Sequence, residues 1–425
     1  MDDRPNQAAL SADCPTEAPA ERILDGVKVL DLSRVVAGPL AGQTLADLGA
    51  DVVKIERVGE GDDLRTLGPP WVTSPTTELE QSTYFQTVNR GKKSLTLDFA
   101  RPEGAEILKA LARESDVFIE NFRTGTLARY GLGYEDLHAI NPRLIYCSIT
   151  GFGQTGPYRD RSGYDYLAQA MGGQMAVTGL PDGMTGAGPM RVGVPIADIT
   201  AGNNAVIAIL AALYHRERSG KGQHIDISLL DSQVALLLNS LSAWMNARAP
   251  LPRTGNDHPT AVPNGVFAVK DGHILIATFN DREFARLAEV LGHPEWGQDP
   301  RYARSRDRLA NRVQLTEDMT EALSHHGKQH WMKAINGAKV SCGPINDMAD
   351  IEQDEQLAVR EMFVTLHHPV MGDVRVAGSP LKFSETPVDI SRAPPLVGED
   401  SEAILRERLT LTDTEIQNLR ANKII

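Results

Sequence analysis

Two aspartates are placed where a carboxylate could take part in chemistry. Asp165 lies in SGYDYLAQAMGG and Asp198 in VGVPIADITAGNNAVIAIL, each beside glycines and just ahead of an apolar helical segment. The positive end of a helix would favour the ionised form of Asp198. An aspartate in this position can also simply cap the helix, and the residue pattern by itself favours that structural role. The pattern therefore leaves a catalytic carboxylate and a helix cap as alternatives.

Other motifs that could carry chemistry are weaker. The sequence GFGQTG at 151–156 has the form GxGxxG, but it follows several strand–helix units, and PYRDRSG after it is a poor helix. A glycine-rich strand exit is therefore favoured over a dinucleotide site. His326 and His330 are spaced for one helix face but lack a neighbouring carboxylate or cysteine, which favours surface histidines. No GxSxG elbow or cysteine nucleophile motif is present, and we expect no metal site.

The elements that must position these residues alternate between strands and helices. A short apolar run at 27–33 is typical of a buried parallel strand, and Gly38-Pro39 opens a helical segment before a second strand at 50–57. The same alternation continues to the strand RLIYCSIT at 143–150. It predicts an α/β fold with a Rossmann-like parallel sheet and helices on both faces.

The second half of the chain follows another pattern. An apolar helix is expected over 199–214, the proline-bearing stretch 249–263 is typical of a linker, and a hairpin should turn at Asp271-Gly272. We therefore expect a disordered extension at 1–23, a large α/β domain at 24–228, a linker and small α+β domain at 229–340, and a segment at 341–425 that returns to the large domain.

Composition excludes several classes of protein. The net charge of −13 would repel a nucleic-acid backbone, and aromatic residues make up only 5% of the 425 residues. The longest wholly apolar run, 205–213, is shorter than the ~20 residues that span a bilayer. Three widely spaced cysteines and an acidic N-terminus without an apolar core indicate a reducing, cytoplasmic location. We expect neither a nucleic-acid nor a membrane partner.

Several longer motifs bear a resemblance to one family. The segment GVKVLDLSRVVAGPLAGQTLADLGADVVKIER resembles the opening of class III CoA-transferases, the family of formyl-CoA:oxalate and carnitine CoA-transferases. The resemblance continues in the same order through NRGKKSLTLDF, ENFRTGTLARYGLGYEDL, GYDYLAQAMGG, ADITAG, RERSGKGQHIDISLLDS, SCGPIND and PPLVGED. It implies a CoA-transferase that forms an interlocked homodimer and uses coenzyme A as a substrate, with no other cofactor.

The resemblance also implies roles for individual residues. The family's nucleophile is an aspartate at the position of Asp198, so a catalytic role replaces the helix cap as our interpretation. Asp165 matches an acidic active-site position and is a supporting candidate. Residues that match the family's CoA site are Arg34, Val35, Val36, Ala37, Arg57, Leu97, Ala100, Asn121, Phe122 and Arg129. In that match, Arg57 contacts the adenosine 3′-phosphate region and Arg129 is a further phosphate-binding arginine. Leu97 and Ala100 lie around adenine, and Asn121 and Phe122 lie along the pantetheine arm.

The implied chemistry passes through Asp198 as a mixed anhydride and then as an aspartyl-CoA thioester. Formyl-CoA:oxalate enzymes have a glutamine where Val36 stands, and a run of glycines where RTGNDHPTAVPNG contains the isolated Gly255. These departures disfavour oxalate as the acceptor. They make the chain more similar to members that use dicarboxylic acyl groups such as succinyl.

Two alternatives belong to other classes. An α-methylacyl-CoA racemase shares the N-terminal motifs but uses a histidine in a GHDINY-like segment, which here reads GYDYLA. His138 is the only histidine upstream of Asp198. A non-catalytic CoA-binding protein would not need the ADITAG motif. Deuterium uptake at the α-carbon would indicate a racemase, and acid-dependent CoA exchange would indicate a transferase.

Overall fold

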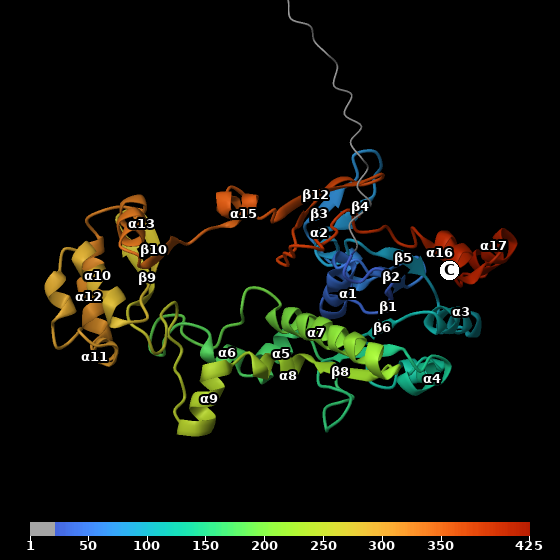
Figure 1. Cartoon of the computed structure of the whole chain (residues 1–425), viewed down its shortest axis with the longest axis horizontal. Helices are drawn as coiled ribbons and strands as arrows, with labels where there is room; N and C mark the ends of the chain where they lie inside the picture. Colours follow the sequence, from blue (N-terminus) through green and yellow to red (C-terminus); the bar gives the residue numbers. More distant parts are fainter. Residues whose placement is uncertain (1–21) are drawn as a thin grey trace, which may run out of the picture.

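The computed structural model describes residues 22–425, and a six-stranded parallel sheet forms its centre (Figure 1). The expected extension therefore lies almost wholly outside the described residues. The strand order is β5-β2-β1-β6-β7-β8, and every neighbouring pair is parallel. The strands are β1 (Lys28–Asp31), β2 (Asp51–Glu56), β5 (Lys93–Thr96), β6 (Val117–Glu120), β7 (Ile145–Thr150) and β8 (His224–Ser228). The predicted α/β class with a parallel sheet is confirmed.

Helices cover both faces of this sheet because its strands are apolar on both sides. Val29, Val117 and other residues of one face pack against α1 (Ala37–Asp47) and α7 (Ile196–Ser219). The opposite face packs against α3 (Pro102–Arg113), α4 (Tyr134–Ile140), α16 (Ser401–Leu409) and α17 (Asp413–Ala421). The last two helices bring the C-terminal end of the chain onto the large sheet (Figure 1).

The chain changes direction across the sheet between β1 and β6. From β1 it passes to β2 on one side, and β6 pairs with β1 on the other side. The loops after these two strands therefore diverge and leave a crevice at their carboxyl ends, which is the usual place for a ligand in an open α/β sheet.

A smaller α+β unit lies apart from the large sheet, on the left in Figure 1. Its three-stranded antiparallel sheet consists of β9 (Asn264–Val269), β10 (Gly272–Ala277) and β11 (Ser341–Pro344), with the expected hairpin turning at Asp271-Gly272. Its helices are α10 (Asp281–Val290), α11 (Ser305–Ala310), α12 (Arg312–Leu323) and α13 (Lys328–Gly337), with the 3-10 helix η3 (Pro294–Gly297). Phe267, Ile276, Leu287 and Trp331 are part of its separate core.

The remaining elements lie outside the two main sheets. Two short hairpins are formed by β3 (Trp71–Thr73) with β4 (Glu80–Ser82), and by β12 (Phe363–His368) with β13 (Gly372–Ala377). The other helices are α2 (Thr83–Gln86), α5 (Asp165–Met171), α6 (Gln174–Val177), α8 (Leu229–Ala235), α9 (Leu238–Ala247), α14 (Met348–Glu352) and α15 (Glu355–Val359), with η1 (Asp63–Thr66) and η2 (Leu127–Tyr130).

Helix α7 is longer than the predicted 199–214 and begins at Ile196, so Asp198 lies inside its first turn. Among the described residues, α7 is the one helix whose length and composition would allow it to cross a membrane. Its buried side chains, among them Ala201, Ala205 and Ile209, form part of the core against the sheet and α1.

Three local features bear on the weaker motifs of the sequence. The glycines at 151–156 follow β7 and lead into a loop rather than a helix, as predicted. The rings of His326 and His330 stack with centroids 3.9 Å apart. Residues 22–425 contain no group of histidine, cysteine and carboxylate side chains that could hold a metal ion.

Candidate active site

Asp165 holds the N-terminus of the helix that carries Asp198. Helix α7 begins after Pro195, which cannot cap it through a side chain. The carboxylate of Asp165 instead accepts hydrogen bonds from the backbone N–H groups of Ala197 (2.8 Å) and Asp198 (3.2 Å). Gln169 Nε2 donates to the other oxygen of Asp165 at 2.6 Å and fixes its orientation. Asp165 thus performs the capping role from another helix, and Asp198 is not the cap.

The side chain of Asp198 is consequently free for another role. Among residues 22–425 its carboxylate has no hydrogen-bond donor and no ion-pair partner, although it is only partly exposed. Burial, and then the nearby charge of Asp165, raise the pKa of Asp198 to about 7. The helix N-terminus is expected to favour the ionised form of this carboxylate, but burial and the charge of Asp165 oppose that effect. A poorly solvated carboxylate is a better nucleophile than a hydrated one.

One tyrosine close to Asp198, Tyr84, was not found from the sequence. Burial, followed by the charge of Asp198, raises the pKa of Tyr84, and Tyr166 and Asp165 contribute to the same rise. Tyr84 lies on α2, and Tyr166 lies on α5 next to Asp165. Tyr84 lies five residues before the start of the motif NRGKKSLTLDF, and nothing in its own residue type marks it as part of a site.

Asp198 and six of the predicted CoA-binding residues line a cavity of about 290 Å³. These are Arg34, Val35, Val36, Ala37, Asn121 and Phe122. They follow β1 and β6, the two strands at which the chain reverses direction across the sheet. The fold therefore brings the predicted nucleophile and the predicted thioester-binding segment into one space.

The loop after β1 is held by side chains from two other elements. Asn121 Oδ1 accepts from the Arg34 N–H at 2.9 Å, and Asn121 Nδ2 donates to the Arg34 carbonyl at 2.7 Å. Asp62 accepts from the Val35 N–H at 3.1 Å. Val35 has a φ of +70°, a left-handed conformation that is costly for a β-branched residue. These hydrogen bonds offset that cost and keep Val36 and Ala37 facing the cavity.

Two buried ion pairs stabilise the region around this loop. Lys54 Nζ forms an ion pair with Asp62 at 2.7 Å and donates to the Ser33 carbonyl at 2.8 Å. Lys92 Nζ forms an ion pair with Asp31 at 2.8 Å, and all four charged side chains are almost wholly buried. Burial lowers the pKa of Lys92 to about 8, whereas Asp31 opposes that change. Such pairs cost free energy to desolvate but become strongly destabilising when one partner is removed.

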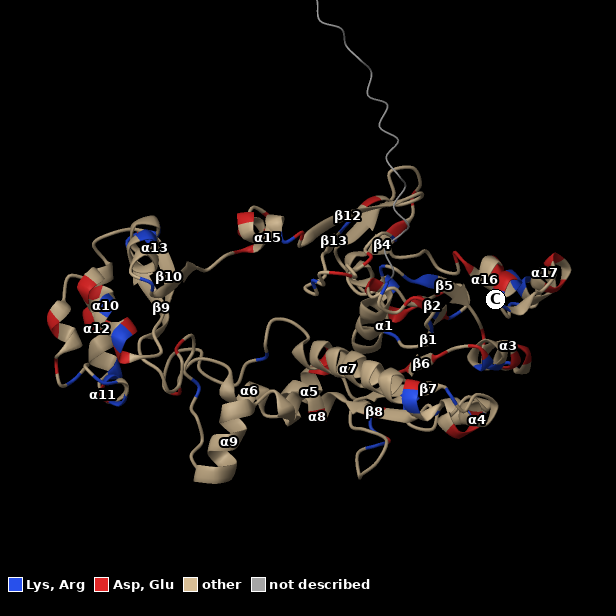
Figure 2. Ribbon diagram, viewed as in Figure 1, with Lys and Arg blue, Asp and Glu red and all other residues tan. Residues whose placement is uncertain are grey.

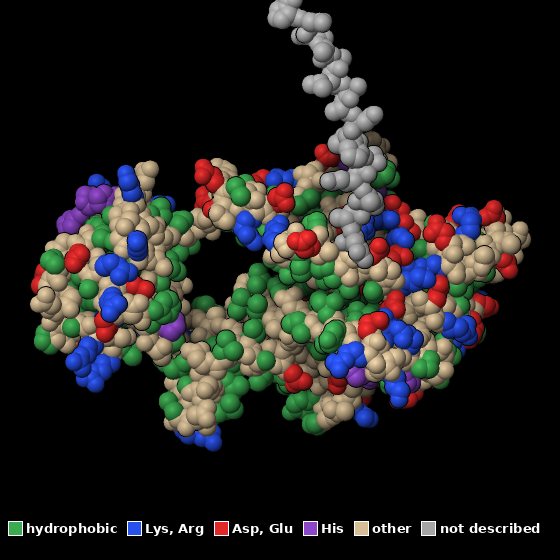
Figure 3. All heavy atoms as spheres, viewed as in Figure 1, with side chains coloured by type: hydrophobic (Ala, Val, Ile, Leu, Met, Phe, Trp, Pro, Cys, Tyr) green, Lys and Arg blue, Asp and Glu red, His purple; other side chains and the backbone are tan. Residues whose placement is uncertain are grey.

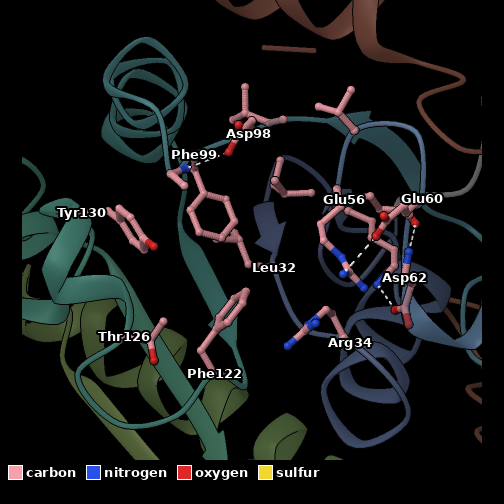
Figure 4. A pocket seen from close by; sticks show the side chains of 17 residues that line it. Leu32, Arg34, Glu56, Glu60, Asp62, Asp98, Phe99, Phe122, Thr126 and Tyr130 are labelled. Carbon is pink, nitrogen blue, oxygen red and sulfur yellow. Dashed lines mark hydrogen bonds and ion pairs between the residues drawn. The ribbon is translucent and has the colours of Figure 1, made fainter. Parts of the chain in front are cut away.

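A second cavity of about 410 Å³ lies on the other side of Arg34 and Phe122 (Figure 4). Three more predicted residues line it: Arg57, Leu97 and Ala100. Figure 4 shows the rings of Phe99, Phe122 and Tyr130 along one side, with Arg34 across from them. Because both cavities share Arg34 and Phe122, an elongated ligand can pass from this aromatic-lined space to Asp198.

The two predicted phosphate-binding arginines differ in their surroundings. Arg57 forms ion pairs with Glu60 at 3.1 Å and with Asp63, so a phosphate group would compete with these carboxylates. Arg129 lies exposed on η2, whose last residue, Tyr130, lines the larger cavity, but Arg129 itself lines neither cavity. Its role stays a prediction.

The family model "CoA-transferase family III" matches residues 24–401, and the chain belongs to this family. It is 42% identical to a "Succinate--glutarate CoA-transferase" from Agrobacterium fabrum, over 95% of this chain and 99% of that one. It is 40% identical to an "Acetyl-CoA:oxalate CoA-transferase" from Acetobacter aceti, over 94% of this chain and 99% of that one. A CAIB/BAIF family protein from Brucella suis has the same fold, with a TM-score of 0.81 at 42% identity over 91% of this chain and all of that one. The chain is thus a family III CoA-transferase.

Proposed function

We propose that this enzyme transfers CoA between succinyl-CoA and a dicarboxylic acid, with Asp198 as the nucleophile. The observation that carries this proposal is the Asp198 carboxylate, which has no partner among residues 22–425. It lies at one end of two adjoining cavities, whose other end fits a nucleotide. The relative from Agrobacterium fabrum, named for succinate and glutarate, supports the choice of substrates.

In the first half of the reaction, a carboxylate oxygen of Asp198 attacks the thioester carbonyl of the donor. The new C–O bond forms as the C–S bond breaks, giving a mixed anhydride and the CoA thiolate. The thiolate then attacks the carbonyl carbon of Asp198. This step forms the aspartyl-CoA thioester and releases the donor acid as its carboxylate.

The second half repeats these steps in reverse order with the acceptor. The acceptor carboxylate attacks the aspartyl thioester, forming a second anhydride and releasing the CoA thiolate. The thiolate attacks the acceptor carbonyl, which yields the new acyl-CoA and restores the carboxylate of Asp198. Each step exchanges one activated acyl group for another, so we propose that no metal ion or further cofactor takes part.

Backbone N–H groups are available for the negative oxygen of each tetrahedral intermediate. Helix α1 begins at Ala37, and no side chain of residues 22–425 caps it. Val36 and Ala37 line the cavity that contains Asp198. We propose that their N–H groups, at the positive end of α1, stabilise the oxyanions.

The racemase alternative lacks its base in this site. None of the described residues that line the cavity around Asp198 is a histidine. His138, the candidate upstream in the sequence, stacks on Tyr134 of α4 with ring centroids 5.1 Å apart. Its position is on the far side of the sheet from α7.

The proposed function is tested by assaying the purified protein with succinyl-CoA and a panel of acids, in buffer made with deuterated water. Glutarate, oxalate and monocarboxylic acids belong in the panel, and oxalate is included because one of the relatives is named for it. We expect an acyl-CoA that matches the acceptor, formed without deuterium at its α-carbon. Deuterium uptake without CoA transfer would contradict the proposal and favour the racemase alternative.

We further propose that the enzyme is an interlocked homodimer. Exposed apolar side chains gather on α7 and α9, among them Ile207, Tyr214, Leu238 and Trp244. Figure 2 shows α9 and most of α7 without charged residues, and Figure 3 shows an opening between the small unit and the rest of the chain. A second copy threaded through this opening would cover those side chains. Sedimentation of a monomer at micromolar concentration would contradict this proposal.

A further inference from the structure

The glycine-rich segment after β7 forms a loop that closes at its base. A side chain on Gly151 would lie 2.5 Å from the Cα of Gly163, so the backbone crosses itself where only glycine fits. The loop between these glycines presents residues 152–162 beside the cavity of Asp198, and Arg159, Arg161 and Ser162 line that cavity. Gly151, the first glycine of the motif, is therefore required by this close approach rather than by a dinucleotide.

Aromatic rings hold Arg161 in this loop. Its guanidinium lies 4.6 Å from the ring centroid of Tyr158 and 5.2 Å from that of Phe152. These two rings pack edge to face, with centroids 5.6 Å apart. Among residues 22–425 no carboxylate lies within ion-pair distance of Arg161, whereas Arg159 pairs with Asp160 at 3.5 Å. Arg161 is thus an oriented cation whose N–H groups are free for a ligand.

The cavity around Asp198 is rich in positive charge. Four arginines line it, Arg34, Arg123, Arg159 and Arg161, against the carboxylates of Asp63 and Asp198. Arg34 is paired with Asp63 at 3.0 Å. When Asp198 becomes an anhydride or a thioester its own negative charge is lost, so the excess of positive charge grows during the reaction. An acyl group with a second carboxylate would balance that excess.

We propose that Arg161 binds the distal carboxylate of the dicarboxylic acyl group while its other carboxyl is joined to Asp198. This inference rests on the proposed function and adds the residue that selects dicarboxylic over neutral acyl groups. A guanidinium can donate two parallel hydrogen bonds to a carboxylate, and stacking reduces the entropy lost when it does so. Arg161 is therefore a specificity-determining residue rather than a participant in bond making.

The test compares glutarate with its monoamide, which has nearly the same size but no distal charge, using succinyl-CoA as donor. For Arg161→Gln we expect kcat/KM with glutarate to fall about 10- to 100-fold relative to kcat/KM with the monoamide. Arg161→Lys should recover part of this preference because it keeps the charge but not the planar fork. Arg301→Gln serves as the control, since Arg301 also stacks on a tyrosine, Tyr302, but belongs to the small unit.

Binding of free CoA, measured by calorimetry, separates this role from phosphate binding. Arg161→Gln should bind CoA with unchanged affinity. An unchanged preference for glutarate over the monoamide would overturn the inference, and so would an equal loss with both acids accompanied by weaker CoA binding. Failure of the wild-type protein to transfer CoA to any acid would instead refute the proposed function.

Discussion

Replacing Asp198 by asparagine should make the protein more stable at pH 8 while abolishing CoA transfer. The carboxylate has no partner among the described residues, and burial together with Asp165 raises its pKa from 3.8 to about 7. Ionised Asp198 therefore destabilises the folded state. Asparagine has nearly the same shape but no charge, so the substitution removes this free-energy cost. The amide cannot form the anhydride, so the variant should lose CoA-transfer activity while its stability increases.

The magnitude follows from the change in pKa. At 1.36 kcal/mol per pKa unit, a rise from 3.8 to about 7 corresponds to at most about 4 kcal/mol. Because the side chain is partly exposed, solvent screening reduces this figure, and we expect a gain of about 1–2 kcal/mol. The folded-state pKa lies above the unfolded one, so the cost is complete above pH 7 and shrinks as the pH falls toward 4.

Urea unfolding of the wild type and of Asp198→Asn at pH 8 and pH 5 provides the measurement. The free energy of unfolding should be higher for the variant at pH 8, with a smaller difference at pH 5. Asp231→Asn is a suitable control, since Asp231 is an exposed residue in the first turn of α8. Lower stability of Asp198→Asn at pH 8 would refute the conclusion that this carboxylate is held at a cost to folding.

Three further results are expected. Asp165→Asn should move the acidic limb of the pH profile of kcat/KM to lower pH, because it removes the second charge that raises the pKa of Asp198; an unmoved limb would argue against that coupling. Lys54→Met should lower the free energy of unfolding by about 3–5 kcal/mol, measured in urea, because it leaves Asp62 buried without its partner; a loss below 1 kcal/mol would contradict the assigned pairing. Arg57→Ala should weaken calorimetric binding of CoA about tenfold, with little change for 3′-dephospho-CoA; equal losses for both ligands would remove Arg57 from the 3′-phosphate site.

The large sheet could be predicted from the sequence because its strands are short apolar runs separated by helices with clear start and stop residues. The hairpin at Asp271-Gly272 was equally visible, since its signal is local. The start of α7 could not be predicted from the sequence, because its cap comes from Asp165, more than thirty residues earlier in the chain. A pattern of neighbouring residues cannot predict a contact between residues so far apart in the sequence.

The candidate site could likewise be predicted only in part from the sequence. The family resemblance placed the residues after β1 and β6 together, and the structure brings six of them into the cavity of Asp198. The contribution of Tyr84 depends on how α2 packs, which the residue type does not reveal. Lys54 and Lys92 interrupt or border apolar strands, and only their buried partners Asp62 and Asp31 explain why charge is tolerated there.

The central claim, covalent catalysis by Asp198, is tested most directly by trapping its acyl intermediates. The enzyme is mixed with succinyl-CoA, treated with hydroxylamine and digested, and the peptides are examined by mass spectrometry. Our account predicts a hydroxamate on the side chain of Asp198 alone, dependent on succinyl-CoA and absent from Asp198→Asn. Active enzyme whose Asp198 is never modified, or normal transfer by an Asp198→Asn protein shown to be free of deamidation, would contradict it.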